Sequence, residues 1–399
     1  MAFTKNNILD SIREVCGQFN ENTIHDYLCS SNHTSHINLD AFISDLKKIA
    51  RLTDNVKTKT HFILSLLRVH SRKIDKDGRG SSIIIETTKR CNHACPHCYS
   101  VSRDNTDMED HVLKKILRFS YLHYKYVFLT GGEPLLDQRI FSMASQYPDL
   151  IFFFFTNGSL MSEETAYNLS LSPNLIPMLS INGDTEGLHD SLKYPGSYQE
   201  ILNAIKHLNQ YDIPWGFLSV ITEQNAENVL SREFIRTLKT KGAIIGRYLE
   251  YLPVGEKANP ELIPSGATYY LMEKRKKEII ENQEIYMQEL CQEKCRGLIF
   301  FDVYGNIKNC PFFHYAKHNV NKGNIQELVA DSLQDWSAAS YAGECPVYSN
   351  IFEFRNYLQD RDWHYTLDGN EEYLRAPSIG AIMEKNYRDF LFLKASGNQ

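Results

Sequence analysis

The sequence predicts an α/β protein built on a parallel sheet, and three observations support this class. From residue 83 onward, short runs of β-branched or aromatic residues alternate with longer stretches that suit helices, such as Tyr198–Leu208. Consecutive strands separated by helices form right-handed βαβ units, whose strands run parallel. Polar and glycine-rich motifs follow several of the runs, at the strand ends where parallel α/β proteins gather their chemistry. The expected strands are Ile83–Thr87, Tyr126–Thr130, Ile151–Thr156, Met178–Ile181, Trp215–Ile221 and Ile244–Tyr251.

The composition is that of a soluble globular protein. Of 399 residues, 42% are hydrophobic and 23% are charged, which is ordinary for such proteins. The formal net charge is −6, so we expect no broad basic field and no nucleic acid partner. No apolar run approaches the roughly 20 residues of a membrane span, and the opening residues lack the pattern of a secretory signal. We therefore expect a cytoplasmic protein with no membrane span.

The chain divides into four expected regions. Residues 1–78 are expected to be helical, and 79–256 hold the strands. Residues 257–350 begin with a charged stretch, Met272–Glu289, which we expect to be helical, and continue into a cysteine-bearing region. Residues 351–399 form a tail to which the sequence gives no role. The helical expectation for the first region rests on apolar residues that share one face at helical spacing, namely Leu39, Phe42, Leu46, Ile49 and Leu52.

Three cysteines follow the first expected strand. Cys91, Cys95 and Cys98 have C-x3-C-x2-C spacing, and three soft thiolates in one short loop can hold three corners of a cubane iron–sulfur cluster. The next cysteines along the chain are Cys29 and Cys291, so one iron would stay open to another ligand. A zinc site is the alternative. Zinc usually takes four protein ligands, and His93 or His97 could supply the fourth.

This loop after the first strand resembles the signature of the radical S-adenosylmethionine (SAM) superfamily. The resemblance implies a partial (β/α)6 TIM-like barrel over residues 79–256 and a [4Fe–4S] cluster with three cysteine ligands. SAM would chelate the open iron and be cleaved to a 5′-deoxyadenosyl radical that abstracts hydrogen from substrate. Cys91, Cys95 and Cys98 would then serve catalysis as well as metal binding. The resemblance also places His97 and Tyr99 beside the adenine.

Further motifs follow the next strands. Two glycines in Thr130-Gly-Gly-Glu-Pro134 let the backbone approach a ligand closely. The motif resembles the one that binds the SAM amino group, so that role is expected for Gly131, Gly132 and Glu133. The turns after strands three and four offer further cofactor contacts, and the expected ones are Asn157, Ser180 and Asn182. Related sequences usually read Ser-Ile-Asp-Gly at the last turn, so Asn182 keeps hydrogen bonding but loses a negative charge.

A second metal site is expected downstream. A hairpin around Tyr304-Gly305 would bring Cys295 and Cys310 towards each other. The arrangement resembles the SPASM or twitch extension that carries an auxiliary iron–sulfur cluster, and Gly323–Leu328 strengthens that resemblance. We expect one auxiliary cluster rather than two, with buried structural cysteines as the alternative. Its ligands would come from Cys291, Cys295, Cys310 and Cys345.

The expected function is that of a radical SAM enzyme acting on a peptide or a small biosynthetic intermediate, with a reductant such as flavodoxin or ferredoxin. Lys193 and Asp190 could reach the substrate or could lie on a solvated helix face. A SAM-dependent methyl or adenosyl transferase is one alternative. A noncatalytic, metal-stapled interaction module is the alternative from another class.

Overall fold

The computed structural model describes most of the chain. The described residues are 5–30, 37, 39–50, 56–71, 82–100, 105–124, 126–254, 258–282, 285–287, 297–312, 314–339, 362–366 and 377–396. The glycines and serines of Lys76–Ser82 predict a linker, which lies outside these ranges except for Ser82. Three of the four downstream cysteines, Cys291, Cys295 and Cys345, also lie outside them.

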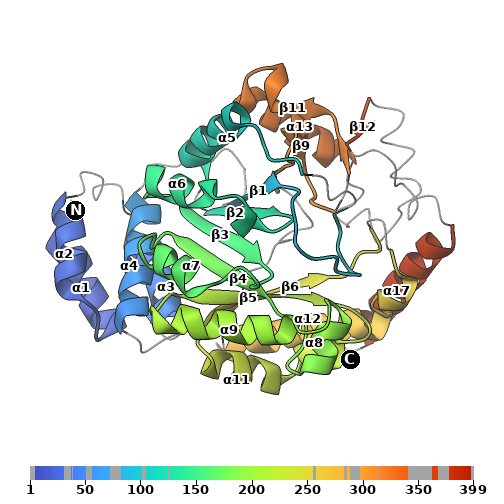
Figure 1. The fold of residues 1–399 in the computed structure, drawn as a ribbon, viewed down its shortest axis with the longest axis horizontal. Helices are drawn as coiled ribbons and strands as arrows, with labels where there is room; N and C mark the ends of the chain where they lie inside the picture. Colours follow the sequence, from blue (N-terminus) through green and yellow to red (C-terminus); the bar gives the residue numbers. More distant parts are fainter. Residues whose placement is uncertain are drawn as a thin grey trace.

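A ten-stranded sheet organises the fold, in the order β11-β9-β8-β1-β2-β3-β4-β5-β6-β7 (Figure 1). The six strands from β1 to β6 pair in parallel, so the predicted α/β class is confirmed. These strands are β1 Ser82–Thr88, β2 Tyr126–Gly131, β3 Ile151–Thr156, β4 Leu175–Ser180, β5 Trp215–Ile221 and β6 Ala243–Glu250. The strand β4 begins three residues before its predicted start, because Pro177 interrupts the apolar run from which the strand was read.

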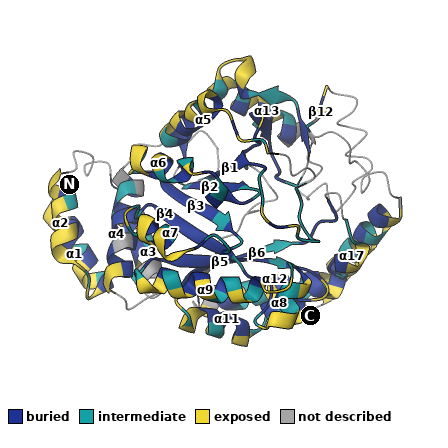
Figure 2. Ribbon diagram, viewed as in Figure 1, coloured by how far each residue is buried: buried dark blue, intermediate teal, exposed yellow. Residues whose placement is uncertain are grey.

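Helices cover the outer face of the sheet, and Figure 2 shows the buried strands enclosed by helices that are exposed on one side. Alternate strand residues serve the two faces. Ile83 and Ile85 pack outward against helices such as α5, whereas Ile84 belongs to the cluster on the inner face. The helices are α5 Asp110–His123, α6 Arg139–Gln146, α7 Glu163–Ser170, α8 Glu186–Ser191, α9 Ser197–Gln210, α10 Ala226–Val229, α11 Arg232–Thr240 and α12 Gly266–Asn282.

The amino-terminal helices form a separate apolar core against the amino ends of the strands. They are α1 Lys5–Cys16, α2 Glu21–Ser30, α3 Leu39–Ala50 and α4 Val56–Ser71, which confirms the helical prediction where the structure describes it. Phe42 and Leu46, from the predicted apolar face, are fully buried in this core. Phe62 of α4 joins the inner-face cluster beside Ile151 and Ile176, at the end of the barrel opposite the cysteine loop. In the described ranges, no helix is long and apolar enough to cross a membrane.

The carboxyl-terminal region continues the main sheet. β8 (Phe300–Phe301) pairs in parallel with β1 and antiparallel with β9 (Asn306–Lys308). The predicted hairpin is thus confirmed, with Gly305 at a φ of 79° in its turn. The strands β10 (Tyr315–Ala316) and β12 (His364–Tyr365) form a small second sheet. The remaining elements are β11 His318–Asn319, α13 Ile325–Ala339, α17 Pro377–Ser396 and the 3-10 turns Pro134–Leu136, Pro260–Leu262 and Val320–Lys322.

One predicted helix has different ends. The charged stretch expected over Met272–Glu289 forms α12, which begins at Gly266 and ends at Asn282. Tyr286–Met287 is instead a short strand, β7, that pairs with β6 at the edge of the sheet. Pairing at an open sheet edge overrides the helical pattern there. The tail, for which no role was predicted, contributes α17, and this helix packs along α12.

Candidate functional site

The predicted site residues meet at one cavity at the carboxyl ends of the strands. The cavity encloses about 1070 Å³ of empty space continuous with solvent. Its wall includes Cys91, Cys95 and Cys98 from the loop after β1. Other predicted residues on the wall are His97, Tyr99, Gly131, Gly132, Glu133, Asn157 and Ser180. Parallel βαβ topology explains this convergence, because the strands all end at the same rim.

The cysteine loop presents its three thiols to this cavity. Residues 91–95 belong to neither a helix nor a strand. The backbone N–H of His93 donates to Cys91 Sγ at 3.4 Å, and the N–H of Cys98 donates to the carbonyl of Cys95 at 3.3 Å. Burial raises the pKa of the Cys91 thiol to about 11. A bound cation has the opposite effect, because it stabilises the thiolate. Among the residues that the structure describes, no three His, Cys, Asp or Glu side chains form a site for a single metal ion.

The base of the cysteine loop lies so close to the end of β2 that only glycines fit at positions 131 and 132. A Cβ at Gly132 would lie 2.0 Å from the carbonyl oxygen of Arg90, and one at Gly131 would lie 2.2 Å from that of Thr88. The N–H of Gly132 donates to the Thr88 carbonyl at 2.7 Å, and the N–H of Glu133 donates to the Arg90 carbonyl at 2.8 Å. The close approach is therefore to the protein's own backbone, which seats the loop against β2.

Glu133 is a buried carboxylate on the cavity wall. Its side chain accepts hydrogen bonds from Thr156 Oγ1 at 2.7 Å, the N–H of Asn157 at 2.8 Å and the N–H of Leu135 at 3.2 Å. Burial raises the pKa of Glu133, while these three donors lower it. A carboxylate held in this way is suited to bind a ligand ammonium group.

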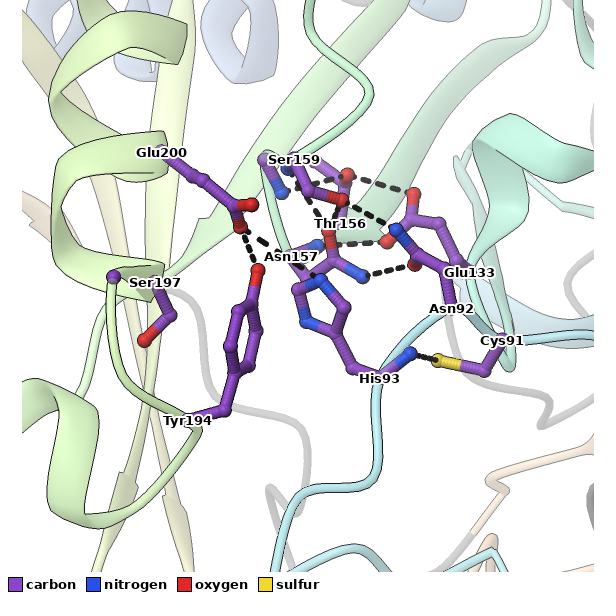
Figure 3. A network of polar contacts seen from close by, with 12 residues as sticks. Cys91, Asn92, His93, Glu133, Thr156, Asn157, Ser159, Tyr194, Ser197 and Glu200 are labelled. Carbon is purple, nitrogen blue, oxygen red and sulfur yellow. Dashed lines mark hydrogen bonds and ion pairs between the residues drawn. The ribbon is translucent and has the colours of Figure 1, made fainter.

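Asn92 ties the cysteine loop to the end of β3 (Figure 3). Its carbonyl accepts from Asn157 Nδ2 at 3.0 Å, and its amide donates to Ser159 Oγ at 2.8 Å. Ser159 Oγ donates in turn to Asn157 Oδ1 at 2.6 Å, which closes a ring of three side chains. Asn157 thus holds the loop in addition to lining the cavity. Asn92 was not among the predicted residues, because a polar residue between two cysteines gives no signal of such a contact.

Asn182 lies behind the cavity wall and connects three segments. Its Oδ1 accepts from the N–H of Val220 at 3.0 Å, so its amide nitrogen faces His97 Nε2 at 3.3 Å and must donate to it. An aspartate at this position could also accept from Val220, but it could meet His97 only as an acceptor. Burial lowers the pKa of His97 to about 3, so this ring is neutral and can accept. The side chain of Asn182, which was predicted to contact the cofactor, therefore forms its hydrogen bonds with protein atoms.

From the sequence, Lys193 and Asp190 could reach the substrate or could lie on a solvated helix face. In the structure the two residues have different surroundings. Lys193 lines the cavity, and it is the one lysine or arginine on that wall in the described part of the chain. Asp190 instead organises the loop before α9. Its carboxylate accepts from the N–H of Gly196 at 2.6 Å, the N–H of Tyr198 at 2.8 Å and the hydroxyl of Ser197 at 2.8 Å.

The carboxyl-terminal region supplies the remaining wall. Phe312 packs edge-on against Tyr99 with ring centroids 5.3 Å apart, and Tyr99 contacts Thr130 Oγ1 through its hydroxyl at 3.2 Å. His314 Nε2 lies 3.3 Å from the Tyr99 carbonyl. Cys310, two residues before Phe312, is buried. Its predicted partner ligands lie outside the described residues, so the auxiliary cluster stays a prediction.

A buried charge cluster joins this region to β1. Its members are two acids and two lysines, Glu86, Asp302, Lys89 and Lys308, each less than a tenth exposed. Glu86 accepts from the N–H of Val303 at 3.1 Å across the junction. Burial lowers the pKa of Lys308, and Asp302 and Glu86 oppose that shift. The hydrogen bond from Val303 to Glu86 joins the hairpin to β1.

Comparisons with known proteins agree with this geometry. Residues 85–234 match the family model of the radical SAM superfamily. That part of the chain is similar to a radical SAM domain, and proteins of that superfamily are enzymes that use a [4Fe–4S] cluster and SAM.

Individual relatives are distant. Mycofactocin maturase MftC of Mycobacterium tuberculosis is 23% identical over 296 residues, covering 66% of this chain and 75% of the relative. GTP 3′,8-cyclase of Clostridium perfringens is 24% identical over 225 residues, covering 53% of this chain and 68% of the relative. The structure of Streptococcus suis SuiB bound to precursor peptide SuiA superposes with a TM-score of 0.55 at 14% identity, covering 82% of each chain. This last likeness shows a shared fold.

Proposed function

We propose that the protein cleaves SAM reductively at a [4Fe–4S] cluster held by Cys91, Cys95 and Cys98, and that it uses the product radical to take hydrogen from an organic substrate. The observation that carries the proposal is the convergence of three thiols, the Glu133 carboxylate and the Lys193 ammonium on one cavity. When bound, the cluster supplies the electron that divides SAM into methionine and the 5′-deoxyadenosyl radical.

The remaining wall residues suit the cofactor's polar groups. Glu133 and Lys193 interact electrostatically across the cavity. An α-amino acid carries an ammonium and a carboxylate side by side, so Glu133 would pair with the first and Lys193 with the second. Gly131 and Gly132 set the position of Glu133, and Asn157 and Ser180 offer polar contacts on the same wall. Tyr99 and the peptide at His97 would border the adenine, with Asn182 fixing the His97 ring.

The substrate would bind beyond the cofactor, against an apolar wall that includes Tyr251, Leu252 and Phe312. Such a wall excludes water from a reactive radical and accepts an apolar part of a substrate. We propose a peptide or a small biosynthetic intermediate as substrate and flavodoxin or ferredoxin as the electron donor. Cys310 would serve an auxiliary cluster together with some of Cys291, Cys295 and Cys345.

The test is 5′-deoxyadenosine formation from SAM by anaerobically reconstituted, dithionite-reduced protein, with Cys95→Ala as the paired variant. We expect deoxyadenosine from the parent and none from the variant. S-adenosylhomocysteine, with two SAM consumed per product, would indicate methyl transfer instead, and a deoxyadenosyl adduct would indicate adenosyl transfer. Deoxyadenosine from Cys95→Ala at the parent's rate would remove Cys95 from the ligand set.

A further inference from the structure

The turn between Cys91 and Cys95 is held from two sides by side chains of its own. Asn92 faces the end of β3, and the His93 side chain faces Tyr194 and Glu200 (Figure 3). The His93 side chain is only 4% exposed. Because residues 91–95 have no helical or strand structure, such side-chain contacts decide how the turn is shaped.

Tyr194 and Glu200 both contact the His93 side chain. The Tyr194 ring meets the His93 ring edge-on, with centroids 4.3 Å apart. Glu200 Oε2 lies 3.7 Å from His93 Nε2, and the Tyr194 hydroxyl donates a hydrogen bond to the same oxygen of Glu200. Tyr194 comes from the loop before α9 and Glu200 from the first turns of α9, so the three side chains close a latch between α9 and the cysteine loop.

The Tyr194 side of this latch is itself fixed. Asp190 accepts three hydrogen bonds from Gly196, Ser197 and Tyr198, which hold the loop that carries Tyr194. On the other side, the backbone N–H of His93 donates to Cys91 Sγ at 3.4 Å. A displacement of His93 would therefore disturb a hydrogen bond to the Cys91 sulfur, which the proposed function assigns to the cluster.

We infer that Tyr194 and Glu200 are positioning residues for the cysteine loop: through His93 they hold the N–H···S hydrogen bond to Cys91 and so control cluster retention and reduction potential. The inference rests on the proposed function, because it requires a cluster at Cys91. Hydrogen bonds to a ligating sulfur stabilise the more reduced cluster. Loss of the latch should lower the reduction potential and speed the loss of iron.

The experiment compares Glu200→Ala and Tyr194→Ala with the parent. Glu200→Ala removes the acceptor oxygens from a partly exposed position in α9, and it is expected to fold because alanine suits a helix. It therefore keeps the test valid if Tyr194→Ala does not fold. Tyr211→Phe is the matched control, since Tyr211 donates to Glu163 at 3.2 Å in a similar pair on the exposed surface away from the cysteines. The measurements are iron loss to a chelator and an EPR-monitored redox titration of the reconstituted protein.

We expect both latch variants to lose iron roughly tenfold faster than the parent, the lower end of the usual effect of residues behind metal ligands. Their reduction potential should also be more negative, while Tyr211→Phe matches the parent. Iron loss and reduction potential unchanged in Glu200→Ala would overturn the inference and leave the proposed function intact. A parent that binds no iron after reconstitution would overturn the proposed function and this inference with it.

Discussion

Gly132→Ala should detach the cysteine loop from β2. The new Cβ would stand 2.0 Å from the Arg90 carbonyl oxygen, 2.5 Å from the Arg90 carbonyl carbon and 2.7 Å from the Lys89 carbonyl oxygen. Backbone atoms surround it on that side, so no flexible side chain can give way. The two segments must separate by about 1.4 Å to restore ordinary contact, which strains or breaks both backbone hydrogen bonds that join them.

The size of the effect follows from these contacts. Overpacking a tight site costs about 1–3 kcal/mol, and each lost hydrogen bond adds roughly 1 kcal/mol. We therefore expect a destabilisation of about 3–5 kcal/mol in the barrel, together with faster loss of iron. Gly187→Ala is the matched control, because a Cβ at Gly187 in α8 meets nothing within 4 Å. The assay is the melting temperature of the metal-free protein, followed by iron content after reconstitution. If Gly132→Ala has the same melting temperature as Gly187→Ala and retains as much iron, then Gly132 is not required for close contact with the cysteine loop.

Three further predictions concern the cavity and its surroundings. Lys193→Ala should raise the KM for SAM about tenfold in deoxyadenosine formation, because a charge-assisted hydrogen bond contributes roughly 1.5 kcal/mol or more; an unchanged KM would place the SAM carboxylate elsewhere. Cys310→Ala should reduce iron content while sparing uncoupled SAM cleavage, and equal iron in variant and parent would remove Cys310 from the metal ligands. Burial lowers the pKa of His189 to about 3, and its Nδ1 accepts the N–H of Asn182 at 3.2 Å. The unfolded chain binds that proton at higher pH than the folded one, so His189 costs stability as pH falls below about 6.5, by roughly 1.4 kcal/mol per unit until the folded pKa is reached. His189→Gln keeps an acceptor and should flatten the fall in melting temperature between pH 6.5 and 4.5; a parallel fall would show that His189 titrates normally.

Local sequence pattern was sufficient for the elements that form the barrel. Runs such as Ile151–Thr156 are apolar on both faces because helices cover one side and the barrel interior lies on the other. The short strands were not predictable in this way. β8 has two residues and is a strand because it pairs with β1, more than 200 positions earlier in the chain. Tyr286–Met287 likewise takes its conformation from the edge of β6.

The site was predictable where spacing alone carries the chemistry. The three cysteines and the Gly-Gly-Glu segment follow strands whose ends must meet, so their convergence could be expected. The supporting contacts could not be predicted. Tyr194 and Glu200 lie about 100 positions from His93 in the sequence, and only the folded chain shows that α9 passes beside the cysteine loop. Asp190 illustrates the same limit, because its role depends on backbone N–H groups that only the folded loop presents.

The presence of a SAM-binding iron–sulfur cluster is tested most directly by metal analysis of the reconstituted parent, combined with EPR spectra of the reduced protein before and after SAM is added. We expect about four irons per chain or more, no stoichiometric zinc, and a cluster signal that changes when SAM is added. Stoichiometric zinc, or an iron cluster whose signal does not respond to SAM, would contradict a SAM-binding cluster at Cys91, Cys95 and Cys98.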